Sequence, residues 1–559
     1  MDLDGVDIEL ARHLIDLHWN RQHYAYLLTY RPAVMQSLAD GGRWCNKLLL
    51  NAMYYTSSLY SDRECLRSTP QDTQSAGDRF YQRFRELLVD EIVRPSIPTT
   101  AALLLTGAAL VSQGRSSAGW TLCGTAYRMI IDMGCHLTVD VQPQGSNQDI
   151  DLDIEFEWRR RLYWGAFLTD ATQSLYLGRQ MTMRPSEARV PQLFLDTYEE
   201  LEEWVPYVDP SQPVKSQSVL LSFRGKPAYA VSVFESLIKL SQKTERITQT
   251  FYSINCVKRT KSDAAKIKME IEQDLSGWLS GLPEHLRFDP ASAEVPPPHQ
   301  ITPHTTYHTL NILLQRPFID GGYLQDRVSP ELRHANEEKC VESALAIWKL
   351  VDAYRTGLTL RRAPFLLSYA VYSAVVVILR QSRKEQQRGA EKRASAGPAD
   401  SATRPQAKAD KFREPINFFW TALSELQRGC NFGLKKPVSI IREMMNELGN
   451  VTPTGGAEVE SGSSSLFAKM LEMYSEPHLS KHSSQQLEFR DTNRPVSGNE
   501  EQAVTDQFAE SQFVPNSNDQ LALPFDPTPP GFLDFLDDTE QTITNDTLYG
   551  LFAQDASWF

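Results

Sequence analysis

The sequence predicts an all-α protein, and three observations support that prediction. From about residue 8 to residue 450 the apolar residues recur with helical spacing. Alternating runs typical of strands are scarce over the same stretch, and short Pro-, Gly- and Ser-rich segments separate stretches long enough for helices. The expected fold is therefore a multi-helix array or bundle, with 41% apolar residues in a chain of 559 to form its core.

One well-marked helix is expected from about Ala118 to Met133. Arg128 and Asp132 stand four residues apart and can form an ion pair, and Gly134 suits the left-handed position that ends many helices. The helix has one apolar face, which we expect to be buried. That face consists of Trp120, Cys123, Tyr127 and Ile130.

A second helix is expected from about Ile154 to Leu177. Glu157 lies in its first turn, where the helix dipole favours an anion, and can pair with Arg161 four residues later. Gly178 is placed to end the helix. Its buried stripe is expected to comprise Trp164, Leu168, Ala171 and Leu175.

The segment from Phe365 to Leu379 is apolar around its whole circumference, which is typical of a helix enclosed by others. Ser and Tyr interrupt it, and it is too short to span a bilayer. Residues 380–413 follow with 10 basic and 4 acidic residues and almost no large apolar ones, so we expect a disordered loop inserted between helices. The helical domain is thus expected to cover residues 1–450.

Almost all of the net charge of −13 lies in the last part of the chain. Residues 451–559 hold 18 acidic and 4 basic residues, whereas residues 1–450 are close to neutral. The tail is rich in Ser, Gly, Gln, Asn and Pro, so we expect it to be disordered. Its final part, residues 521–559, combines seven aromatic with seven acidic residues, a pattern that suggests an activation segment.

Motifs of catalysis and of cofactor binding are absent from the sequence. It contains no phosphate loop, dinucleotide-binding turn, HExxH zinc helix or GxSxG elbow. The seven cysteines are never closer than twelve residues, so they form neither a disulfide framework nor a zinc knuckle. The near-neutral charge of residues 1–450 gives no basic surface for direct reading of DNA. We therefore expect no enzymatic activity, no metal and no cofactor in this chain.

Two segments resemble the signature of a known family. SSAGWTLCGTAYRMIIDMGCHL (116–137) and EWRRRLYWGAFLTDATQSLYLGRQMTMRPSEARVPQ (157–192) are similar to the fungal-specific transcription factor domain, the middle homology region of Zn2Cys6 regulators. The matching positions are Trp120, Gly124, Ala126, Arg128, Met129, Asp132, Gly134, Leu137, Glu157, Arg159, Arg160, Arg161, Trp164, Asp170, Gly178, Arg179, Pro185 and Pro191.

The resemblance implies an all-α regulatory domain in a nuclear protein, which responds to a partner or to a small-molecule effector. Members of the family normally begin with a CxxCx6C zinc cluster that contacts DNA, and the printed sequence contains none. Two explanations stay open, a truncated gene model and a regulator that acts through partners. DNA contact would then require a zinc cluster supplied upstream or by a partner.

The sequence therefore favours a nuclear regulator of RNA polymerase II transcription with a helical regulatory domain and an acidic activation tail. In the tail, a coactivator groove is expected to take up apolar residues as a short helix. The alternative is an all-α enzyme similar to terpenoid synthases, with magnesium held by the string Asp537 to Glu540. Target genes, effector, oligomeric state and the choice between activation and repression are not readable from the sequence. The apolar residues of the proposed activation segment are Phe525, Phe532, Leu533, Phe535 and Leu536.

Overall fold

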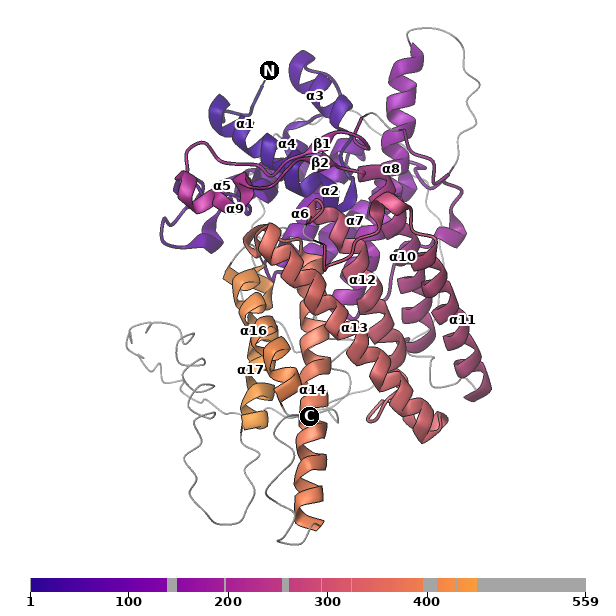
Figure 1. Ribbon diagram of the computed structural model, residues 1–559. Helices are drawn as coiled ribbons and strands as arrows, with labels where there is room; N and C mark the ends of the chain where they lie inside the picture. Colours follow the sequence, from indigo (N-terminus) through magenta and orange to yellow (C-terminus); the bar gives the residue numbers. More distant parts are fainter. Residues whose placement is uncertain are drawn as a thin grey trace, which may run out of the picture. The chain divides into compact units, whose positions relative to one another are not determined.

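The protein is almost entirely helical in the parts that its structure, a computed structural model, describes (Figure 1). The described parts contain one small sheet, in which the two-residue strands β1 (Glu203–Trp204) and β2 (Lys226–Pro227) pair antiparallel. The predicted all-α class is therefore confirmed. The described residues are 2–137, 148–195, 198–253, 261–292, 294–322, 324–395, 410–428 and 431–449.

The elements of the first half pack as a chain of neighbouring helices. Each of α4, α6 and α8 contacts at least two other helices, and α6 and α7 form a hairpin. The elements are α1 (Ile8–Leu17), the π-helix η1 (His18–Gln22), α2 (His23–Tyr26), α3 (Arg31–Asp40), α4 (Lys47–Ser58), η2 (Glu64–Leu66), η3 (Thr73–Ser75), α5 (Asp78–Glu91), α6 (Ile97–Ser112), α7 (Ser116–Asp132), α8 (Gln148–Leu177), η4 (Pro185–Glu187), η5 (Val214–Gln217) and α9 (Ser218–Leu221).

The second half is joined to the first through α10, which packs against both α8 and α12. Helix α14 then lies among α12, α13, α16 and α17 (Figure 1). The elements are α10 (Ala230–Phe251), α11 (Lys261–Ser280), η7 (Glu284–Leu286), α12 (Pro298–Gln315), η8 (Arg316–Phe318), η9 (Gln325–Arg327), α13 (Pro330–Gly357), η10 (Leu360–Arg362), α14 (Phe365–Ser395), η11 (Asp410–Phe412), α16 (Arg413–Arg428), η12 (Phe432–Leu434) and α17 (Lys435–Gly449).

Two glycines allow α6 and α7 to approach closely. A Cβ atom added to Gly107 would lie 2.5 Å from the Cys123 sulfur, and one added to Gly119 would lie 2.5 Å from the Gly107 carbonyl oxygen. No side chain fits at those distances, so the hairpin depends on both glycines.

The two helices of the signature are found where the sequence predicts them. Helix α8 begins six residues earlier than expected, at Gln148, and both helices end before glycines in the left-handed region, with φ of +70° at Gly134 and +65° at Gly178. The four predicted stripe residues of α8 are all buried, as are three of the four predicted for α7.

Two predictions about α7 are wrong. Trp120 is only half-buried, because the closely packed face of this helix is centred on Gly119 and Cys123, which face α6. Arg128 and Asp132 are both exposed, and within the described part of the chain the predicted ion pair between them does not form.

Helix α14 contains the apolar segment predicted to be enclosed. By length and composition alone, Phe365–Glu391 could cross a membrane, with a mean hydropathy of 1.5 in its most apolar window. In the structure, 67% of that window is buried inside the protein, as in a core helix.

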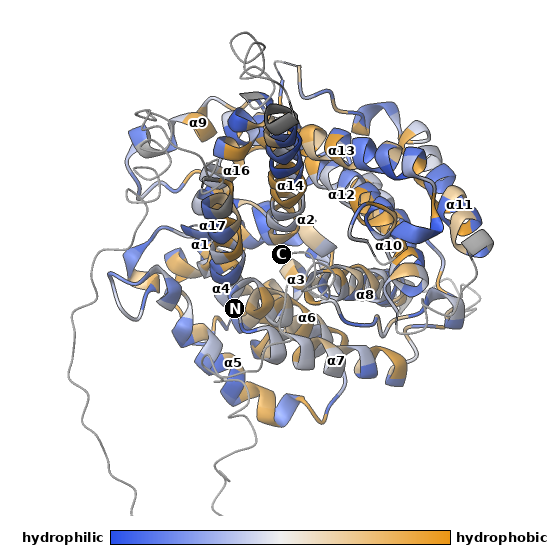
Figure 2. Cartoon of the chain, turned by 90° about the horizontal axis from the view of Figure 1, so that it is seen from below, coloured by the Kyte–Doolittle hydropathy of each residue, from blue (hydrophilic) through white to orange (hydrophobic). Residues whose placement is uncertain are grey.

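The predicted disordered loop at 380–413 is wrong in its first half, because α14 continues to Ser395. Arg, Lys, Glu, Gln and Ala are strong helix formers, so a charged composition does not by itself end a helix. Arg380 also donates to the Asp320 carbonyl, and Lys384 pairs with Asp320 and Glu337. In Figure 2 this end of α14 is the blue end nearest the viewer. Residues 396–409, the tail 451–559 and its segment 521–559 lie outside the described residues.

Candidate functional site

Two buried polar sites involve α8, and the first is an ion-pair network around Arg161. The Arg161 side chain has no exposed surface. Its Nε donates to Glu157 Oε1 at 2.7 Å and its Nη1 donates to Glu199 Oε2 at 2.6 Å. The remaining Nη2 donates to the Leu195 carbonyl at 2.9 Å, so every nitrogen of this guanidinium has an acceptor.

The network extends to the N-terminal segment through a histidine. His23 Nε2 lies 3.0 Å from Glu199 Oε1, and Arg160 lies 3.2 Å from the second oxygen of Glu157. Burial opposes ionisation of Glu199, but His23 and Arg161 beside it lower its pKa to about 2. The network therefore ties α2, α8 and the segment before β1 together through ion pairs and hydrogen bonds.

The second buried site is Asp170, also on α8. Its Oδ2 accepts the backbone N–H groups of Thr182 at 2.6 Å and Met183 at 2.7 Å, and Ser174 donates to Oδ1 at 3.3 Å. Burial raises the pKa of Asp170 to about 7 in spite of these donors. The carboxyl group thus holds the loop that follows Gly178 against its own helix.

The other signature residues lie around these two sites and do not converge on one point. Arg159 pairs with Glu155 and donates to the Met133 carbonyl at 2.7 Å, which satisfies an end of α7. Arg179 lies over the half-buried Trp120 ring at 5.2 Å.

Three further signature positions are Trp164, Pro185 and Gly124. Trp164 is 4% exposed and donates to the Pro191 carbonyl at 3.2 Å. Pro185 begins η4, and a Cβ atom on Gly124 would meet nothing within 4 Å. Most signature residues therefore hold α7, α8 and the following loop together, and they act as a framework.

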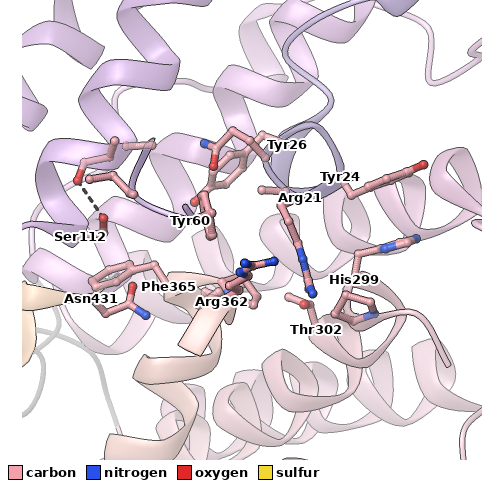
Figure 3. A pocket seen from close by; sticks show the side chains of 18 of the residues that line it. Arg21, Tyr24, Tyr26, Tyr60, Ser112, His299, Thr302, Arg362, Phe365 and Asn431 are labelled. Atoms are coloured by element: carbon pink, nitrogen blue, oxygen red, sulfur yellow. Dashed lines mark hydrogen bonds between the residues drawn. The ribbon is translucent and has the colours of Figure 1, made fainter. Parts of the chain in front are cut away.

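A cavity of about 80 Å³ lies at the junction of the two halves. Helices α6, α8, α10, α12 and α14 contribute to its wall, together with the π-helix η1, α2 and the turn at η10. Leu168 is the one residue of α8 on this wall, so the cavity is distinct from the ion-pair network. Figure 3 shows the side chains around it.

Arg21 enters the cavity from η1 and is 9% exposed. Among the described residues its Nε and Nη2 atoms have no hydrogen-bond partner, and its guanidinium carbon lies 5.4 Å from the centre of the Trp204 ring. Burial, followed by the neighbouring charge of Arg362, lowers the pKa of Arg21, while the hydroxyl groups of Tyr354 and Tyr60 oppose this shift. The described part of the chain offers Arg21 no salt bridge.

Arg362 enters the same space from η10 and is 4% exposed. It lies 3.2 Å from Asp62 Oδ2 and donates to the Tyr207 carbonyl at 3.2 Å. Arg361 lies 2.6 Å from the other oxygen of Asp62, so the Asp62 carboxylate forms ion pairs with both Arg361 and Arg362.

His299 stands beside Arg21 in Figure 3. Its Nε2 donates to the Ala228 carbonyl at 2.6 Å, and its ring stacks on Tyr24 at 4.3 Å. Burial lowers the pKa of His299 to about 4, so the ring is neutral near pH 7 and its Nδ1, which has no partner, is an acceptor.

Sequence reasoning missed this cavity. Its two arginines are 341 positions apart in the chain, and neither falls in a signature segment. Arg21 stands in the mostly polar string HWNRQHY, where no local pattern marks it as part of a site. The π-helix that carries Arg21 is a rare conformation that recurs at functional sites.

The described residues offer no evident metal centre. No group of three or more His, Cys, Asp or Glu side chains among them is placed to hold a metal ion. The string Asp537 to Glu540 and the apolar residues Phe525, Phe532, Leu533, Phe535 and Leu536 lie outside the described residues.

Part of the chain is similar to a known family domain. Residues 15–280 match the fungal specific transcription factor domain. This range includes both signature segments, so the resemblance of those segments to the domain is confirmed. The matched range contains both buried sites of α8 and Arg21, whereas Arg362 lies beyond it.

Several curated proteins are similar to this chain. Nitrogen assimilation transcription factor nit-4 of Neurospora crassa is 27% identical over 382 residues, which are 66% of this chain and 33% of that protein. Nitrogen assimilation transcription factor nirA of Emericella nidulans is 27% identical over 383 residues, 67% of this chain and 40% of that protein. Activatory protein CHA4 of Saccharomyces cerevisiae is 23% identical over 374 residues, 64% and 52% respectively. The chain thus spans between a third and about half of the length of these relatives.

Proposed function

We propose that this chain is a nuclear regulator of transcription in which a helical regulatory domain controls an acidic activation tail. The observation that supports this most strongly is the family match over residues 15–280 together with relatives that align over about two thirds of the chain. The helices surround a cavity into which two arginines project, an arrangement that suits regulation by a partner or ligand.

The activating function is assigned to the tail because of its composition. Residues 495–559 contain 12 acidic residues and no basic ones, together with clustered aromatics. The acidic residues keep these apolar side chains in solution, and a coactivator groove can then take them up as a short helix.

A reporter assay tests the proposal. Residues 495–559 fused to an unrelated DNA-binding module should activate transcription. The variant in which Phe532, Phe535 and Leu536 are changed to Ala keeps every charge and should lose most of the activity, because the hydrophobic contacts are gone. The matched control changes Thr539, Thr542 and Thr544 to Ala in the same segment and should stay active. An inactive parent fusion, or a fully active aromatic variant, would remove the activation segment from the proposal.

DNA recognition is proposed to come from a zinc cluster supplied upstream or by a partner. Residues 1–450 carry nearly equal numbers of basic and acidic residues, so their own DNA binding should be weak and sensitive to salt. We propose no bound zinc in residues 1–559, because no two cysteines have the spacing of local ligands. Elemental analysis showing a tightly held zinc ion in the purified chain would contradict this part.

We propose no catalytic activity for the chain, since the similar proteins bear the names of transcription factors and of an activatory protein. The terpenoid-synthase alternative needs acidic side chains around a helical cavity. The cavity described above is lined by two arginines and by no acidic residue, so no observation on the described residues favours that alternative.

A further inference from the structure

The central cavity has an excess of positive charge. Its wall includes Arg21 and Arg362 and no Asp or Glu. Asp62, which pairs with Arg362, is shared between Arg361 and Arg362. Arg362 therefore shares its carboxylate with a second arginine, and Arg21 has no carboxylate partner among the described residues.

Arg21 is the buried positive charge that has no counter-ion among the described residues. Two of its nitrogen atoms have no acceptor, although the side chain is more than nine-tenths buried. The Trp204 ring and the hydroxyl groups of Tyr354 and Tyr60 stabilise the cation only in part. A buried charge without a counter-ion is costly, and proteins retain one where it serves binding or catalysis.

We infer that the cavity binds a small oxyanion, with its oxygen atoms between the guanidinium groups of Arg21 and Arg362. Figure 3 shows both guanidinium groups pointing into the same space from different elements, with Thr302 and His299 beside them. The planar guanidinium group donates two parallel hydrogen bonds to a carboxylate, phosphate or similar anion. An anion there would supply the acceptors that Nε and Nη2 of Arg21 lack.

The size and the walls of the cavity narrow the ligand class. A water molecule needs about 10–15 Å³ measured in this way, so 80 Å³ admits roughly five to eight non-hydrogen atoms. Nucleotides and other large anions are excluded. Leu59, Leu168, Leu237 and Phe365 add apolar surface to a wall that also holds polar side chains, and this apolar surface favours a short organic carboxylate over a purely inorganic anion.

The position of the cavity gives such a ligand influence over the whole domain. Its wall combines α6 and α8 of the first half with α10, α12 and α14 of the second. An anion bound there would neutralise the repulsion between Arg21 and Arg362 and draw the two halves together. A regulatory role for this effect rests on the proposed function, whereas anion binding itself does not.

Thermal unfolding and calorimetry on the full chain 1–559 test the inference. Sodium acetate, butyrate, phosphate, sulfate and nitrate are compared with sodium chloride at equal ionic strength. We expect at least one oxyanion to raise Tm by about 2 °C or more relative to chloride, with a measurable Kd. Carboxylates acting more strongly than inorganic anions would identify an organic ligand, and the reverse order an inorganic one. No rise with any oxyanion would overturn the inference.

Variants locate the effect. Arg21→Met keeps the apolar stem and removes the charge, so the oxyanion should bind at least tenfold more weakly. The control Arg12→Met removes an exposed arginine of the neighbouring helix α1 and should bind as the wild type does. If Arg21→Met does not fold, Arg21→Lys is measured in its place. It keeps the positive charge but loses the planar guanidinium group, so it should also bind the oxyanion more weakly than the wild type. Unchanged affinity in the folded Arg21 variant would refute the site.

Discussion

Two buried arginines of this domain, Arg161 and Arg21, differ in whether their guanidinium nitrogens have acceptors inside the protein. This difference distinguishes a structural residue from a residue placed to bind a ligand. Arg161 has no exposed surface, and all three of its nitrogen atoms donate to acceptors within 2.9 Å, two of them on carboxylates. Arg21 is almost as deeply buried, yet two of its nitrogen atoms have no acceptor. A buried arginine whose charge is paired inside the protein stabilises one arrangement of elements, whereas an unpaired one is positioned for a ligand.

The largest effect is expected where the paired network is broken. Arg161→Met removes the buried cation shared by Glu157 and Glu199 and leaves them only Arg160 and His23, so we expect the free energy of unfolding to fall by about 3–5 kcal/mol. Urea denaturation followed by circular dichroism measures it. The control Arg43→Met removes an exposed arginine that pairs with Glu155, which lies on α8 as Arg161 does. It should lower the free energy of unfolding by less than about 1 kcal/mol. Equal losses in the two variants would show that Arg161 is no more important than a surface residue.

The two signature tryptophans should also differ in their contribution to stability, with the more buried one contributing more. Trp164 is 4% exposed, so Trp164→Ala should cost about 3–5 kcal/mol of unfolding free energy. Trp120 is half-buried beneath Arg179, so Trp120→Ala should cost only about 1–2 kcal/mol. The urea midpoints of both variants, measured side by side, check the order, and a larger loss at Trp120 would contradict it.

Asp170 should make the stability of the domain depend on pH. Its pKa is raised by burial from 3.8 to about 7, so between these values the folded protein binds more protons than the unfolded chain. The contribution of Asp170 to the free energy of unfolding is therefore fully present below about pH 4 and is lost as the pH rises through 7. Asp170→Asn does not titrate, so its unfolding free energy relative to wild type should improve by about 2 kcal/mol from pH 5 to pH 8. A difference that stays constant with pH would show that the hydrogen bonds from Thr182 and Met183 keep the carboxyl group ionised.

The sequence predicts the framework better than the cavity, for a physical reason. Helices α7 and α8 were predictable because apolar spacing and terminal glycines are local, and the Glu157–Arg161 pair is set by a spacing of four residues. Glu199 and His23 complete the same network from distant segments, so no local pattern indicates them. The burial of Trp120 is predicted wrongly because helical spacing shows which side of a helix is buried but not how far the buried surface extends around it. The cavity requires several helices to meet, and only the fold brings Arg21 beside Arg362.

The measurement that tests this comparison most directly is the stability of Arg21→Met in chloride buffer without any oxyanion. If Arg21 is a ligand-binding charge with no counter-ion inside the protein, removing it should leave the free energy of unfolding unchanged or raise it by about 1 kcal/mol. Urea denaturation of Arg21→Met, Arg161→Met and the wild type under identical conditions supplies the answer. We expect Arg21→Met to be at least as stable as the wild type while Arg161→Met is strongly destabilised. A loss in Arg21→Met as large as that in Arg161→Met would contradict the distinction between the two arginines.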